Sequence, residues 1–157
     1  MTVKIKGLKK LNAKLKKLPP AAEKAIREAM EKGANEIVAM MKSLVPVDSG
    51  ELRDSIGWTW GERPRYSQAL ATVKSKDGKL TLTIYAGNAR VRYAHLVEFG
   101  AAPHIAGGMF KGAQHPGAPA QPFFFVSWRA LRRRTKSRIT RAITKSAKEV
   151  AKGGSST

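Results

Sequence analysis

Apolar residues recur every three or four positions in two long stretches of the chain, and this spacing predicts two long amphipathic helices. In the first stretch, residues 21–44, the apolar face is Ile26, Met30, Gly33/Ala34, Ile37, Met41 and Leu44. Pro20 suits the first turn of this helix, and Pro46 ends it. The second helix is expected from Pro122 onward, with a weaker apolar seam made of Phe125, Trp128, Leu131, Thr135, Ile139, Ala142, Ser146 and Val150.

The middle of the chain has the alternation that is typical of β-strands. Leu80, Leu82 and Ile84 alternate with Thr81, Thr83 and Tyr85, which predicts a half-buried strand. Asp77–Gly78 is a two-residue turn signal, so residues 69–76 and 79–86 are expected to form an antiparallel hairpin. Trp58 and Trp60 alternate with Thr59 and predict a further short strand.

Short elements are expected at three other places. Val3 and Ile5 indicate a short N-terminal strand, and the leucines at 8, 11, 15 and 18 indicate a short helix after it. Asp48 and Glu51 have the spacing of a capping box, which would open a helix through Leu52 and Ile56. Residues 93–99 predict another short helix with Gly100 as its C-cap.

Residues 100–122 hold five glycines, four prolines and one charged residue, and they show no periodicity. We therefore expect a long loop without regular structure, which orders only when the protein assembles. Residues 1–152 are expected to form a single domain, and residues 153–157 a disordered tail.

Composition narrows the classes of protein. The chain has 157 residues, no cysteine and a formal net charge of +19. The lack of cysteine excludes disulfides and thiolate metal sites, and neither a membrane-spanning run nor a secretory signal is recognisable. Sixteen of the charge units lie in residues 1–18 and 123–157, whereas the middle is nearly balanced. The charge predicts a polyanionic or acidic partner, so a basic nucleic-acid-binding protein is the alternative function.

Catalytic and metal chemistry finds little support in the sequence. His95, Glu98, His104 and His115 could form a metal site, but their spacing matches no zinc signature, and a structural role is preferred. No nucleophile elbow or phosphate-binding loop is present, so we expect no enzyme and no cofactor. Glu98 lies in an otherwise apolar segment, which suggests a paired carboxylate, a hydrogen bond at a helix terminus, or simple exposure.

The aromatic and the basic residues near the C-terminal helix can each be interpreted in two ways. The tryptophans and residues 123–125 could stack on bases, although a core or subunit-interface role is more common. Candidate contacts to DNA or to an acidic partner are Arg132, Arg133, Arg134, Lys136, Arg138 and Arg141. The alternative for this basic set is a solvated helix face.

Three blocks of sequence, in order, resemble those of a siphophage tail-component family of tail-completion and head–tail joining proteins. The first is Pro46-Val47-Asp48-Ser49-Gly50-Glu51-Leu52-Arg53-Asp54-Ser55-Ile56. The second is Tyr93-Ala94-His95-Leu96-Val97-Glu98-Phe99-Gly100. The third is His115-Pro116-Gly117 followed by Ala120-Gln121-Pro122-Phe123. The chain departs from the family pattern in residues 105–114 and in its very basic last helix.

The resemblance implies an α+β fold, in which a small antiparallel sheet packs against a long helix in the N-terminal half and a long C-terminal helix. It also implies a homo-oligomeric, hexameric ring in the neck of the virion, assembled in the bacterial cytoplasm. Such a ring joins the tail tube protein to the head–tail connector proteins, with non-specific contact to DNA in its lumen and no membrane. No catalytic residues come with the resemblance.

Overall fold

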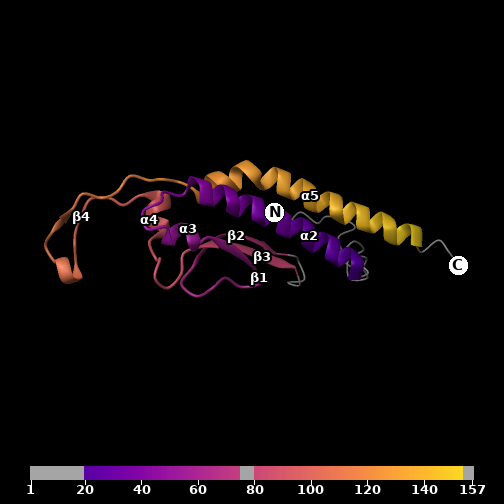
Figure 1. Ribbon diagram of the computed structural model, residues 1–157, viewed down its shortest axis with the longest axis horizontal. Helices are drawn as coiled ribbons and strands as arrows, with labels where there is room; N and C mark the ends of the chain where they lie inside the picture. Colours follow the sequence, from indigo (N-terminus) through magenta and orange to yellow (C-terminus); the bar gives the residue numbers. More distant parts are fainter. Residues whose placement is uncertain (1–19, 75–79, 154–157) are drawn as a thin grey trace, which may run out of the picture.

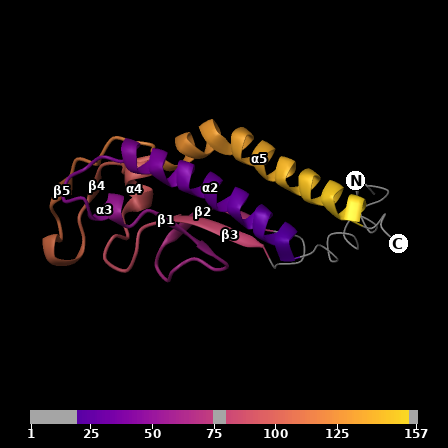
Figure 2. The same ribbon diagram turned by 45° about the vertical axis from the view of Figure 1, so that its right-hand side comes forward.

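The computed structural model describes residues 20–74 and 80–153 and has an α+β fold. Two long helices, α2 (Pro20–Leu44) and α5 (Phe124–Gly153), lie side by side and run antiparallel (Figure 1). They pack over one face of a three-stranded sheet (Figure 2). The small antiparallel sheet and the two long helices are therefore as predicted. The expected strand and helix within residues 3–18, the turn at 77–78 and the final residues 154–157 lie outside the described residues.

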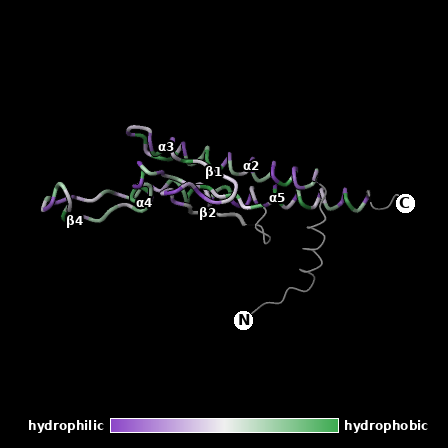
Figure 3. Tube along the Cα trace, turned by 90° about the horizontal axis from the view of Figure 1, so that it is seen from below, coloured by the Kyte–Doolittle hydropathy of each residue, from purple (hydrophilic) through white to green (hydrophobic). Residues whose placement is uncertain are grey.

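Helix α2 supplies one wall of the core, as its apolar spacing predicts. Its most buried side chains include Ile26, Met30, Ile37 and Met41, which lie on one face of the helix. Pro46 follows the last turn, so the helix ends at the predicted place. Figure 3 shows the resulting alternation of hydrophilic and hydrophobic positions along both long helices.

The sheet has the strand order β1-β3-β2, with both pairs antiparallel. Strand β1 (Gly57–Trp60), strand β2 (Gln68–Lys74) and strand β3 (Thr81–Ala86) confirm the predicted strands. Trp58 and Trp60 pair with Ile84 and Leu82, and their indole N–H groups donate to Asn35 and Glu31 of α2. Trp58 and Trp60 therefore join the sheet to the helix layer instead of lying free to stack on bases.

Strand β3 is buried more completely than simple alternation predicts. Thr83 is buried although it points away from the Leu82 and Ile84 face. Its hydroxyl donates to the carbonyl of Gly61 at 2.7 Å, which satisfies the polar group without water.

Helix α5 begins in the core and its last turns extend past the sheet (Figure 1). Phe123 and Phe124 are fully buried at its start, and Trp128 packs partly against the core. The prediction that these aromatic residues belong to the core is therefore correct for this segment. Val150, the last residue of the predicted seam, is exposed because the helix there has passed the end of the sheet.

Two short helices follow the prediction in position. Helix α3 (Glu51–Asp54) begins after Gly50, and helix α4 (Ala94–Phe99) ends at Gly100. The predicted capping box is wrong, because Gly50, in a left-handed conformation with φ 84°, occupies the N-cap and has no side chain to accept a hydrogen bond. The N–H of Glu51 donates instead to the Ser49 hydroxyl at 3.4 Å. Asp48 is two residues too early to take that position.

Residues 101–118 form a hairpin, which corrects the expected loop without regular structure. Strands β4 (His104–Ile105) and β5 (Gln114–His115) pair antiparallel, and a 3₁₀ turn, η1 (Gly108–Phe110), lies in the segment that connects them. Ala101 and Ala118 close its base through two hydrogen bonds of 2.9 Å. This hairpin, which we call the arm, projects from one end of the body (Figures 1 and 2).

Candidate functional site

The second and third sequence blocks meet at one buried carboxylate. Glu98, at the end of α4, is only 3 % exposed and faces the first turn of α5. Its Oε2 accepts the backbone N–H groups of Phe123 and Phe124 at 2.8 and 2.9 Å. Its Oε1 accepts the N–H of Phe125 at 3.0 Å. Of the alternatives for Glu98, the hydrogen bond at a helix terminus is correct.

This arrangement explains why the position holds a glutamate. The first N–H groups of a helix have no partner within the helix, and their dipoles leave partial positive charge there. A buried carboxylate with three N–H donors exchanges its water shell for charge-assisted hydrogen bonds. The Glu98 carboxylate therefore fixes the start of α5 and holds Phe123 and Phe124 inside the core.

The first block lies against the same end of the body. Leu52 and Ile56 are buried in the core, while Asp48 and Ser49 are exposed. The Ser55 hydroxyl donates to the carbonyl of Leu52 at 2.7 Å and accepts the N–H of Gly87 at 3.1 Å. A Cβ added at Gly87 would in turn lie 3.7 Å from the Cβ of Ala94 in the second block, so this glycine lies close to both blocks. The structure thus connects the first block to the second through one residue between them.

Two glycines allow the arm to leave the body. Gly100 has φ 77°, and a Cβ there would lie 2.9 Å from the carbonyl oxygen of Ala118. Gly117 has φ 81° and lies directly against the carbonyl of Ala101. Both positions combine a left-handed backbone with a close approach, so only glycine fits them without strain. Pro116 and Pro122, also in the third block, are exposed on the returning strand and before α5.

The histidines do not converge on a metal site. His95 Nδ1 lies 2.9 Å from the side-chain amide of Gln68, whereas the rings of His104 and His115 stack across the arm with 4.9 Å between centroids. The Glu98 carboxylate accepts hydrogen bonds from the start of α5. Among the residues that the structure describes, no group of three or more His, Asp or Glu could hold a metal ion.

Part of the predicted basic set is paired within the chain. Arg138 Nη2 lies 2.7 Å from Glu36 of α2, and Arg134 Nε lies 3.5 Å from the same carboxylate. The hydrogen bond from Arg138 lowers the pKa of Glu36 below its ordinary value of 4.5. Arg132, Arg133 and Lys136 are exposed on α5. These three side chains and Arg141 are exposed, unlike the half-buried Arg138, and remain the candidates for contact with an acidic partner.

Comparison with known protein families decides the class of this molecule. The model of a family described as "Bacteriophage HK97-gp10, putative tail-component" matches residues 9–100. The chain belongs to this bacteriophage tail-component family. Neither a curated protein nor a solved structure matches the chain. The matched residues contain the first two blocks and end at Gly100, where the arm begins.

Family membership makes the chain a bacteriophage tail component, which acts in the virion beside other virion proteins. No helix within the described ranges is long and apolar enough to cross a membrane.

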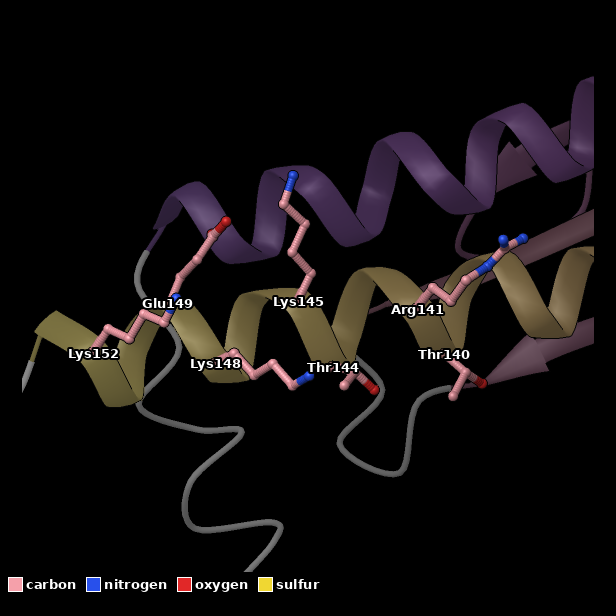
Figure 4. A pocket seen from close by; sticks show the side chains of 7 residues that line it. All are labelled: Thr140, Arg141, Thr144, Lys145, Lys148, Glu149 and Lys152. Atoms are coloured by element: carbon pink, nitrogen blue, oxygen red, sulfur yellow. The ribbon is translucent and has the colours of Figure 1, made fainter.

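One surface hollow of this tail component lacks the features of a small-molecule site. It runs along the last turns of α5 and is lined by Thr140, Arg141, Thr144, Lys145, Lys148, Glu149 and Lys152. Figure 4 shows that these side chains come from successive turns of one helix and diverge instead of converging on one point. A ligand pocket needs convergent polar groups in an apolar cleft, which this hollow does not provide.

The tail component exposes apolar side chains at the tip of the arm, a feature that the sequence analysis missed. Met109 is 93 % exposed, and Ile105 and Phe110 are each 71 % exposed. A second exposed set at the root of the arm consists of Leu96 and Phe99 on α4 and Tyr93, the N-cap residue of that helix. The sequence did contain one sign of this exposed surface, because the apolar pair Met109-Phe110 lies in the centre of a segment otherwise rich in glycine and proline.

Proposed function

We propose that this tail component is a subunit of a homo-oligomeric ring in the neck of a tailed bacteriophage or phage-like particle, where it joins the tail tube to the head–tail connector. The observation that carries the proposal is membership of the tail-component family. Its role is structural and not catalytic. The Glu98 junction supports this role, because the buried carboxylate stabilises the body and leaves no free reactive group there.

The shape of the molecule also supports a joining role. The body is fixed by a helix pair and a sheet, and the arm extends from one end with exposed apolar side chains at its tip. A projecting apolar element on a soluble protein usually marks a protein–protein contact. A hexameric ring remains the expected assembly, with the tail tube and connector proteins as partners on its two faces.

Native mass spectrometry of the full chain and negative-stain images test the ring directly. The expected result is a closed oligomer, with six copies indicated by the mass. Immunogold labelling of purified particles should place the chain at the junction of head and tail. Monomers in solution, together with label away from the neck, would contradict the proposal.

A nucleic-acid role is the second candidate, and the exposed side of α5 favours it. Residues 123–157 carry ten basic residues and one acidic residue. Non-specific phosphate contacts by these residues would suit DNA passing through a ring lumen.

Salt-dependent binding of duplex DNA measures this role. Replacing Arg132, Arg133 and Lys136 together with Gln should reduce the slope of log affinity against log salt by about 3, since each phosphate contact contributes roughly 0.9. Lys24→Gln, on α2, is the matched control. An unchanged slope in the triple variant, or no binding near physiological salt, would remove this candidate.

A further inference from the structure

We propose that the tip of the arm binds a second copy of this chain, on the exposed apolar face of α4. We define the tip as Ile105, Met109 and Phe110, and the ledge as Tyr93, Leu96 and Phe99. The inference rests on the proposed ring and deepens it, because it names the contact that would hold neighbouring subunits together.

The tip is built to project. Ala106 N–H donates to the carbonyl of Ala113 at 2.7 Å, and Gly112 N–H donates to the carbonyl of Ala106 at 3.0 Å. These bonds hold the turn while its apolar side chains remain in solvent. The Met109 side chain is 93 % exposed, so no described part of the body covers it. Exposed side chains of this size on a projecting element indicate a docking surface.

The ledge offers a matching surface. Its three residues are spaced by three positions, so they share one side of α4. Phe99 is 63 % exposed, although its ring also lies 5.9 Å from that of Phe125, which fixes its position. Neither the tip nor the ledge contains a charged residue. Contact between them would therefore remove apolar surface from water without stripping a charge of its solvent.

A chain cannot make this contact with itself. The arm begins directly after α4, and a strand rises about 3.3 Å per residue, so Gly108 lies roughly 20 Å from the root. The paired strands keep the tip at that distance from its own ledge. Docking between copies also gives the arm support, because an isolated two-stranded hairpin is only marginally stable in water.

Two different complementary patches on one chain produce a head-to-tail contact. Such a heterologous contact repeats from one subunit to the next until the assembly closes into a ring or grows as a filament. The tip and ledge thus provide the type of interface that a ring requires, and this argues for a second copy as the occupant rather than an unrelated tail protein.

Analytical ultracentrifugation of full-length variants tests the contact. Met109→Ser/Phe110→Ser removes the tip, and Leu96→Ser/Phe99→Ser removes the ledge. Each should weaken self-association by at least about 30-fold per hot-spot side chain. Val150→Ser, an exposed apolar residue on α5, is the matched control and should assemble like the original chain. Circular dichroism checks that each variant is folded.

A mixture of the two variants gives the sharpest result. The intact tip of the ledge variant can still bind the intact ledge of the tip variant, so the mixture should form dimers and no larger species. Because the chain has no cysteine, a Phe110→Cys/Leu96→Cys variant should also form disulfides only between copies. Dimers in the mixture and intermolecular disulfides support the inference.

Other outcomes separate this inference from the ring itself. A tip variant that still forms rings would overturn the inference and leave the proposed function intact. A wild-type chain that is monomeric in solution would also overturn the inference, whereas its position in particles would still decide the proposed function. Dimers formed by the ledge variant alone, whose tip is intact, would indicate tip-to-tip contact and contradict the ledge as the binding surface.

Discussion

Glu98→Gln should destabilise the fold strongly, although the change replaces one atom. The amide can keep one oxygen at the position of Oε2 and retain the bonds to Phe123 and Phe124. Its NH₂ group then faces the N–H of Phe125, which loses its acceptor. One buried unpaired donor costs about 1–3 kcal/mol.

The lost charge adds to that cost. A carboxylate near a partly buried helix N-terminus is worth up to about 2 kcal/mol through the helix dipole. Together the two effects should lower the free energy of unfolding by about 2–4 kcal/mol. For a chain of this size, such a loss corresponds to a fall in Tm of roughly 5–15 °C.

Urea unfolding monitored by tryptophan fluorescence and by circular dichroism measures this free energy. Glu62→Gln is the control, since Glu62 is exposed and the same chemical change there should stay within about 0.5 kcal/mol. Glu98→Ala should cost more than Glu98→Gln, because it leaves all three N–H groups without the carboxylate. If Glu98→Gln and Glu62→Gln unfold at the same urea concentration, the capping argument is refuted.

Three further predictions concern other contacts. Because Arg138 lowers the pKa of Glu36, their pairing stabilises the fold above about pH 4.5 and is lost as the pH falls through the lowered value. Glu36→Gln should therefore be less stable than wild type at pH 7, and urea midpoints of the two should converge in acid. Gly117→Ala should loosen the arm and speed its amide hydrogen exchange. Gly107→Ala should not, because a Cβ there meets open space. Equal exchange rates in the two variants would contradict the argument that the chain approaches Gly117 closely. Gly33→Val should cost about 1–3 kcal/mol of stability by overpacking against α5, and an unchanged Tm would show that the helices can separate.

Local patterns were sufficient for the framework of the fold. The spacing of Ile26, Met30 and Ile37 predicts the buried face of α2 because a helix repeats every 3.6 residues. The same reasoning placed the strands and α5. For Glu98, a lone carboxylate among apolar residues indicated a special role, but only the structure shows that its partners begin 25 residues later in the chain.

Contacts that depend on tertiary packing could not be predicted. Glu36 and Arg138 are 102 residues apart, and nothing in either local sequence indicates the pair. The arm has only two residues in each of its strands, too few for the alternation that reveals a β-strand. The backbone at Gly50 also took the N-cap position that the spacing of Asp48 and Glu51 suggested for a side chain.

The closed base makes the arm a structurally separate part of the chain. Ala101 and Ala118 exchange two backbone hydrogen bonds, which hold the two ends of the arm together where Gly117 allows their close approach. The family match ends at Gly100, immediately before this base. Changes of sequence within residues 102–116 can thus alter the exposed side chains of the arm while the end of α4 and the start of α5 keep their places.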